Sequence, residues 1–350
     1  MAHFAIPALA TGSKVLVTGV NGLLGSHVAD QLLEHGYKVR GTVRDAQKNN
    51  WMVEFFKRKF GEGLFELVEV RDIAQDGAFG RAIKDVFGVV HVASVVSLDP
   101  DPNRVIPLVV DATISALTSA AKEESVQRFV LTSSATAAAV AKPEQQLVVN
   151  ADSWNEESVG LAYKAPEGLT DIEKGFNVYG ASKVKGEQAL WEWVKKNKPD
   201  FVVNCVLPGG NFGRVLSVEH QGFPSTTMMA AALYNNEQDL IDTFIKSYLP
   251  EWFVDVQDTA RLHVAALIHP SVSGERVFAY ASPFNWNNVL QTFRKLYPDR
   301  EFIDDVPGLW DDLSIVEGRE KAEKLLKEMG RSRFTSLEES LKMLVESKEG

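Results

Sequence analysis

Cysteine is almost absent from this chain: Cys205 is the only one among 350 residues. An intrachain disulfide is therefore impossible, which favours a reducing compartment, and we expect a cytoplasmic protein. Cys205 lies in the apolar run 201–207, where a small buried hydrophobic residue is a better interpretation than a nucleophile.

Other absences exclude whole classes of protein. Residues 1–13 lack the basic and apolar segments of a secretory signal, and no apolar run approaches the ~18–20 residues of a membrane span. The 47 acidic residues outnumber the 37 basic ones, and the net charge of −10 argues against nucleic acid or an anionic membrane as a partner. The seven histidines are scattered without metal-ligand spacing, so we expect no metal.

The first half alternates short apolar runs with helical patterns. This alternation predicts an α/β fold with a doubly wound, Rossmann-type parallel sheet. The expected strands cover residues 14–18, 37–43, 64–70, 89–93, 128–132 and 201–207, and the expected helices include 23–35, 113–122 and 182–196. The pattern becomes irregular after Pro208, with helical runs at 227–234, 259–268 and 336–345 and a strand at 276–281. We therefore expect a Rossmann domain over 1–207, joined by some later segments, and a smaller substrate lobe over 208–350.

A glycine-rich loop follows the first expected strand and opens the first expected helix. Its spacing is G-x-x-G-x-x-G, in the strand–turn–helix context that a dinucleotide-binding fingerprint requires. Glycines allow the backbone to approach a pyrophosphate, and the free N–H groups of the helix terminus attract the phosphates. The predicted cofactor residues here are Thr18, Gly19, Asn21, Gly22, Leu23, Leu24 and Gly25.

The end of the second strand should decide the type of dinucleotide. An acidic residue there would bind the ribose of NAD, whereas Arg44 occupies the strand end and Lys48 follows four residues later. A guanidinium suits the 2′-phosphate of NADPH, although the neighbouring Asp45 is a counter-argument. We expect NADPH, and we expect Arg40, within the strand, to be structural.

Tyr179 and Lys183 are four residues apart in a stretch with helical features. This spacing brings a phenol and an ammonium onto one helix face. Because a nearby cation favours the phenolate, we expect Lys183 to lower the pKa of Tyr179 from its ordinary ~10 toward neutrality. The pair is suited to general acid catalysis.

Taken together, these motifs resemble the extended short-chain dehydrogenase/reductase family, in particular its dihydroflavonol reductase-like branch and the yeast aldehyde reductase II-type carbonyl reductases within it. The resemblance covers nearly the whole chain. It includes 18–25 (TGVNGLLG), 39–45 (VRGTVRD), 71–73 (RDI), 88–94 (GVVHVAS), 128–135 (RFVLTSSA), 179–183 (YGASK), 207–209 (LPG) and 286–298 (WNNVLQTFRKLYP).

The resemblance implies a role for each matching residue. Tyr179 would be the general acid, Lys183 would lower its pKa and hold the nicotinamide ribose, and Ser134 would hydrogen-bond the substrate carbonyl. Ser133 would face the cofactor or pack, and Asp72 and Ile73 would contact the adenine. Ala93 and Ser94, after the fourth strand, would line the cofactor, and the turn at Pro208 and Gly209 would lie against the nicotinamide. The turn continues as Gly209, Gly210 and Asn211, which we expect to be more flexible than in relatives, and Asn211 could contact the carboxamide.

The leading prediction is an NADPH-dependent carbonyl reductase acting on aryl ketones or keto esters. A nucleotide-sugar epimerase or dehydratase and a non-catalytic NADP-sensing regulator remain alternatives. A small, hydrophobic and uncharged substrate is expected, with a candidate apolar wall formed by Leu98, Phe176, Met228 and Met229. Residues 143–177 are expected to form a lid or rim, and the chain could be a monomer or a homodimer.

Overall fold

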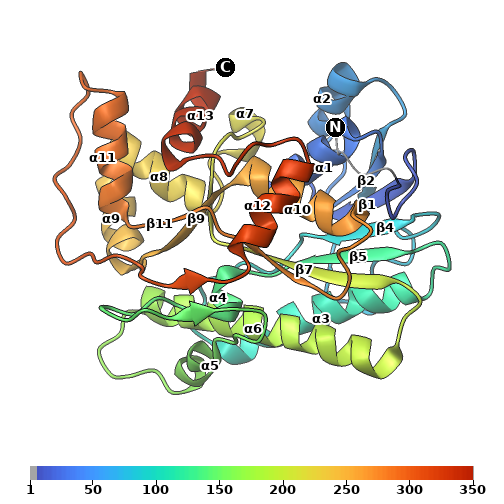
Figure 1. The fold of residues 1–350 in the computed structure, drawn as a ribbon, viewed down its shortest axis with the longest axis horizontal. Helices are drawn as coiled ribbons and strands as arrows, with labels where there is room; N and C mark the ends of the chain where they lie inside the picture. Colours follow the sequence, from blue (N-terminus) through green and yellow to red (C-terminus); the bar gives the residue numbers. More distant parts are fainter. Residues whose placement is uncertain (1–5, 350) are drawn as a thin grey trace.

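A seven-stranded parallel sheet forms the centre of the protein in the computed structural model, which describes residues 6–349 (Figure 1). Residues 1–5, which include His3, and Gly350 lie outside the described part. The strand order is β10-β7-β5-β4-β1-β2-β3. Successive strands are added on one side of β1 up to β3 and on its other side from β4 onward, so the strand order reverses between β1 and β4, the switch point where Rossmann folds bind their ligand. The strands are β1 (Lys14–Thr18), β2 (Lys38–Val43), β3 (Phe65–Glu69), β4 (Gly88–His91), β5 (Arg128–Thr132), β7 (Val202–Pro208) and β10 (Arg276–Ala279).

Helices cover both faces of this sheet. In Figure 1, α3 (Pro102–Ala121) and α6 (Asp171–Asn197) lie together below the sheet, while α1 (Leu23–Glu34), α10 (Val256–Ile268) and α12 (Arg319–Glu328) lie above it. The doubly wound α/β architecture predicted from the alternating pattern is confirmed. The helix α2 (Trp51–Phe60) links β2 to β3.

Two helices begin about eleven residues earlier than the sequence pattern predicted. The helix α6 begins at Asp171 because Thr170 and Glu173 form a reciprocal capping box. The helix α3 begins at Pro102, capped by the Asp101 side chain, and continues through an internal Pro107. The early start of α6 places Tyr179 well inside a helix.

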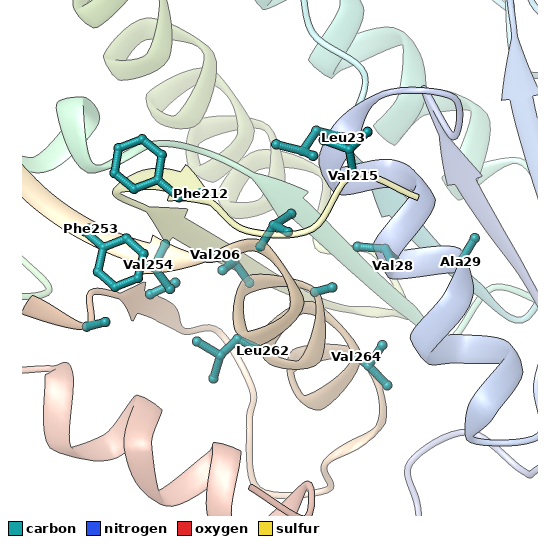
Figure 2. Packing of buried hydrophobic residues seen from close by; sticks show 14 of the residues in the cluster. Leu23, Val28, Ala29, Val206, Phe212, Val215, Phe253, Val254, Leu262 and Val264 are labelled. Carbon is teal, nitrogen blue, oxygen red and sulfur yellow. The ribbon is translucent and has the colours of Figure 1, made fainter. Parts of the chain in front are cut away.

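The later half of the chain contributes directly to the large sheet. The strand β10 pairs with β7, and α10 packs on α1 and against β7. Figure 2 shows Leu262 and Val264 of α10 in the same apolar layer as Val28 of α1 and Val206 of β7. This shared core ties the two halves together.

A smaller lobe lies beside the carboxyl end of the sheet (Figure 1). It contains a three-stranded sheet of β8 (Gly210–Phe212), β9 (Glu251–Asp255) and β11 (Ser282–Phe284). Its other elements are α7 (Val218–Gln221), α8 (Thr226–Asn235), α9 (Gln238–Thr243), the 3₁₀ turn η1 (Ile245–Ser247), α11 (Trp286–Leu296) and α13 (Leu337–Glu349).

The segment before Tyr179 is folded onto the protein. Its strand β6 (Val148–Val149) pairs in parallel with β12 (Ile315–Val316), and α5 (Glu156–Tyr163) packs on α6. The short helix α4 (Ala135–Ala138) precedes it. Residues 143–177 therefore form part of the structured edge of the site, whereas their role as a lid stays a prediction.

The expectation that no apolar segment approaches membrane-spanning length was wrong for helix α3. Pro102–Ala121 is long and apolar enough by length and composition, but 56% of its most apolar window is buried inside the protein. Its buried face packs on α6, as in the core helix of a globular fold.

Candidate active site

The glycine loop connects β1 to α1 at the switch point of the sheet. Gly19 has a φ of +63°, which favours glycine, and a Cβ at Gly25 would collide with the Gly19 carbonyl oxygen. Gly22 is the N-cap of α1 and supplies no side-chain hydrogen bond, so the first amides of the helix lack a side-chain cap. Asn21 and Gly22 are exposed there. The loop therefore offers backbone donors at a helix N-terminus, the chemistry of an anion site.

The loop is fixed from beneath by a buried polar chain. The Thr18 hydroxyl accepts a hydrogen bond from the Ala93 amide at 2.9 Å and lies 3.0 Å from Nδ1 of His91. Burial lowers the pKa of His91 to about 3, so its imidazole is neutral and shares one hydrogen bond with the Thr18 hydroxyl. The strand ends of β1 and β4 are thereby held together.

Arg44 and Lys48 lie on the surface beyond the end of β2. Among the hydrogen bonds and ion pairs of residues 6–349, none involves the Arg44 guanidinium, which is free to meet a ligand. Asp45 instead accepts the backbone N–H of Lys48 at 2.9 Å. Arg40 is structural, as expected, because it binds Glu66 and two backbone carbonyls. Asp72 is also exposed and accepts the Ala74 amide, while Ile73 packs against the core.

The predicted catalytic side chains converge at the carboxyl end of the sheet. Ser134 follows β5 and its hydroxyl hydrogen-bonds the phenol of Tyr179 on α6. Lys183, one turn further along α6, lies 5.8 Å from the centre of the Tyr179 ring. Its ammonium donates to the hydroxyl of Ser94, after β4, at 3.3 Å. Three separate segments thus bring a hydroxyl, a phenol and an ammonium to one place.

The electrostatics of this group differ from the sequence expectation. Burial raises the pKa of Tyr179 above its ordinary value, and the Ser134 hydrogen bond only partly opposes this. Burial also lowers the pKa of Lys183 to about 8. The expected lowering of the Tyr179 pKa by Lys183 was therefore wrong, because burial of both groups outweighs their interaction.

Glu187 is a supporting residue that the sequence analysis missed. It is one turn beyond Lys183 on α6 and is fully buried, where it receives hydrogen bonds from Ser133 at 2.5 Å and Arg276 at 2.7 Å. Arg276 lies on β10 and stacks over Trp154. The Glu187 carboxylate raises the pKa of Lys183 against the effect of burial. A small cavity lies beside this group, lined by Ala93, Ser94, Val109, Ala112, Thr113, Leu131, Thr132, Ser133, Lys183, Gly186 and Glu187.

The turn after Pro208 is rigid, which corrects the expectation of a flexible Gly-Gly-Asn segment. Gly210 and Asn211 belong to β8, and a Cβ at Gly209 would collide with the Trp252 carbonyl. The glycines are needed for close approach of two backbones. Asn211 donates to the Gly209 carbonyl and accepts from Thr259 at 2.7 Å, so its side chain is already engaged within the protein.

The four predicted substrate residues are at least partly buried, and Phe176, Met228 and Met229 share one hydrophobic cluster, whereas their role as a substrate wall stays a prediction. Phe176 packs edge-on against Tyr248, 5.4 Å between ring centres, and is three residues before Tyr179. Leu98 is partly buried and its backbone lies against α6 at Gly175. Met229 is buried in the main core and Met228 packs at its edge. Phe176 is the one of the four that lies on α6 with Tyr179.

Gln221 is a second residue that sequence reasoning missed. Its amide donates to the backbone carbonyls of Asn21 and Gly22 and to the Ser26 hydroxyl, at 3.1–3.3 Å. The adjacent His220 stacks on Trp51 with ring centres 4.7 Å apart. The short helix α7 therefore bridges the glycine loop and α2. No local signal could have shown this, because the partners are about 200 residues apart.

Within residues 6–349, no group of three or more His, Cys, Asp or Glu side chains could hold a metal ion. Cys205 is buried, and burial raises its pKa well above the ordinary value, which suits a packing role.

The parallel sheet, the glycine loop at its switch point and the Ser134–Tyr179–Lys183 group define a dinucleotide-binding protein of the extended short-chain dehydrogenase/reductase class. The model of the NAD dependent epimerase/dehydratase family matches residues 15–279, and the chain belongs to this family.

Similar proteins span almost the whole chain. Aldehyde reductase 2 of Sporidiobolus salmonicolor is 40% identical over 99% of both chains. Ketoreductase adrE of Penicillium roqueforti is 39% identical over 97% of this chain and 96% of its own. Among solved structures, yeast methylglyoxal/isovaleraldehyde reductase Gre2 complexed with NADPH has a TM-score of 0.77 at 24% identity, covering 95% of this chain and 97% of that one. The structural likeness supports the fold.

Proposed function

We propose that this protein reduces aldehydes and ketones to alcohols with NADPH, using Tyr179 as the proton donor. The observation that carries the proposal is the hydrogen bond between Ser134 and Tyr179 with Lys183 one turn away, at the switch point beside the glycine loop. The relatives named aldehyde reductase and ketoreductase support this reaction.

The residues present fit a phosphorylated dinucleotide. The uncapped N-terminus of α1 suits the pyrophosphate, and the close packing at Gly25 holds the loop against the helix. The exposed Arg44 suits a 2′-phosphate, with which a guanidinium forms paired hydrogen bonds. The Gre2 complex with NADPH supports the same choice.

The bound cofactor would supply the hydride for the carbonyl carbon. The side chains of the protein would act on the oxygen: Ser134 and Tyr179 would donate hydrogen bonds to it, and Tyr179 would transfer its proton as negative charge develops there. The raised pKa keeps Tyr179 protonated at neutral pH. The ammonium of Lys183 would stabilise the resulting phenolate, and this charge is lost above about pH 8.

The test is NADPH oxidation against aldehydes, aryl ketones, keto esters and dihydroflavonols. Tyr179→Phe should lose at least ~10²-fold in kcat, the usual scale of general acid catalysis, while still binding NADPH. Tyr163→Phe is the matched control because Tyr163 is 55% exposed on α5. Activity of Tyr179→Phe within a few-fold of wild type would refute the assignment.

The same assay separates the alternatives. An epimerase or dehydratase would convert a nucleotide sugar without net consumption of NADPH. A sensor would bind NADPH but would not oxidise it in the presence of any carbonyl compound. The segment after Ser134, residues 135–137 (ATA), lacks the acidic pair expected of the dehydratases.

A further inference from the structure

Glu251 is a carboxylic acid beside the turn after Pro208 that the proposed reduction does not use. It begins β9 and accepts a hydrogen bond from the hydroxyl of Tyr248. Its Oε1 atom lies 2.7 Å from where a Cβ at Gly210 would be, directly after the Pro208 turn predicted to meet the nicotinamide. Its partner Tyr248 packs against Phe176, three residues before Tyr179 on α6, and the Glu251 carboxylate contributes to the raised pKa of Tyr179. Glu251 is therefore linked both to the predicted nicotinamide turn and to the helix that carries the proton donor.

Aromatic rings pack against Tyr248 of the Glu251–Tyr248 pair. The Tyr248 ring packs edge-on against Phe176 at 5.4 Å and against Trp286 at 5.5 Å. Phe176 is on α6 and Trp286 begins α11, so Tyr248 contacts both the helix that carries Tyr179 and the small lobe. A polar pair among aromatic side chains can fix the orientation of a ligand, because a polar group of the ligand finds a hydrogen-bond partner only at that pair.

The charge around Glu251 is of one sign. The ionisable groups that face it are Tyr248 from its own segment, Tyr179 from α6, Tyr280 after β10 and Asp312 from the segment before β12. Among the ion pairs of residues 6–349, none includes Glu251. Once Glu251 is ionised, no ion pair neutralises its charge, so a second carboxylate beside it would be repelled in a poorly solvated site.

We propose that Glu251 and Tyr248 are specificity-determining residues that receive an uncharged hydrogen-bonding group next to the reacting carbonyl and that disfavour a carboxylate there once Glu251 is ionised. The preferred class is then keto esters, diketones and hydroxy ketones, with keto acids rejected increasingly as Glu251 ionises. This inference rests on the proposed reductase function.

The protonation of Glu251 supplies a signature that a structural role would not produce. Burial raises the pKa of Glu251 to about 8, with a further rise from Asp312 and an opposing effect of the Tyr248 hydrogen bond. The rejection of a carboxylate should therefore strengthen as the pH rises through this value. A neutral ester should be affected much less.

The experiment compares benzoylformate with its ethyl ester as substrates of the whole enzyme. The measured quantity is the ratio of kcat/KM for the ester to kcat/KM for the acid, from pH 6.5 to 9.5. Both substrates need the same hydride and the same Tyr179 proton, so the effect of Lys183 on proton transfer cancels in the ratio, and any attraction of Lys183 for the acid alone persists in Glu251→Gln. We expect the wild-type ratio to rise about 10- to 100-fold across this range, the scale of one unscreened like-charge contact.

Two variants test the assignment. In Glu251→Gln the ratio should be lower and its dependence on pH should be largely lost. In Tyr248→Phe the rise should persist with its midpoint at higher pH, because the hydrogen bond that favours the carboxylate is lost. Glu275→Gln is the control: Glu275 pairs with Lys321 at the surface, 2.5 Å apart, and should leave the ratio unchanged.

The outcomes separate this inference from the proposed function. If neither substrate oxidises NADPH and the wider carbonyl panel is also inert, the reductase assignment itself is wrong. If both substrates react but the ratio stays flat with pH, or rises equally in Glu251→Gln, the specificity role of Glu251 is overturned while the reductase function stands.

Discussion

Replacing Glu187 by glutamine should destabilise the protein strongly, although the change removes only one charge. Glu187 is 1% exposed and the side chain of its partner Arg276 is 6% exposed. Water therefore cannot solvate the Arg276 guanidinium once the Glu187 charge is removed. Breaking a buried ion pair from one side costs about 3–5 kcal/mol. The unfolding entropy is about 2.1 cal/mol/K per residue, roughly 0.7 kcal/mol/K for a chain of 350 residues. The expected loss is therefore about 4–7 °C in Tm.

The assay is differential scanning calorimetry at one scan rate and pH 7. Glu275→Gln is the matched control, because its exposed pair with Lys321 should contribute no more than about 1 kcal/mol, or roughly 1 °C. The double change Glu187→Leu with Arg276→Met should recover part of the loss, because no unpaired charge stays buried. A Tm of Glu187→Gln within about 1 °C of wild type would refute the reasoning.

The same variant has a second readout at the active site. The Glu187 carboxylate opposes the burial that lowers the pKa of Lys183. Its neutralisation should lower that pKa further, so the high-pH limb of kcat for ketone reduction should move to lower pH. A loss of stability with an unmoved pH profile would leave Glu187 as a purely structural residue.

Three further predictions concern the cofactor and the fold. Arg44→Ala should raise the KM for NADPH roughly 10- to 100-fold with little effect on NADH, as expected for loss of one charge-assisted contact; equal weakening of both cofactors would contradict this. Gln221→Ala should increase the dissociation rate of NADPH in stopped-flow fluorescence by removing the bridge to Asn21, and an unchanged rate would show that α7 does not retain the cofactor. Burial raises the pKa of Asp255 to about 7, above the ~3.9 of an unfolded chain. Its contribution to stability is thus fully present below pH ~4 and is lost as the pH rises through about 7. The Tm of Asp255→Asn should therefore fall less than that of wild type between pH 5 and 8. Parallel curves of Tm against pH would exclude this linkage.

Much of the fold was predictable because its signals are local. Each apolar run and each helical pattern is read from neighbours in the chain, and a Rossmann sheet is built from consecutive strand–helix units. The glycine loop was placed correctly after β1 for the same reason. The start of α6 was the main error, although the capping box of Thr170 and Glu173 was present in the sequence.

The spacing of Tyr179 and Lys183 determined by itself that a phenol and an ammonium share one helix face. Only the tertiary structure decided what surrounds them. Glu187 meets Arg276, 89 residues away, and Glu251 reaches Tyr179 from another lobe. Burial, which sets the direction of every pKa shift at this site, depends on how all elements pack and not on any stretch of sequence. The rigid Gly209 turn has the same origin, since its constraint is the backbone of Trp252 on a strand that follows more than 40 residues later.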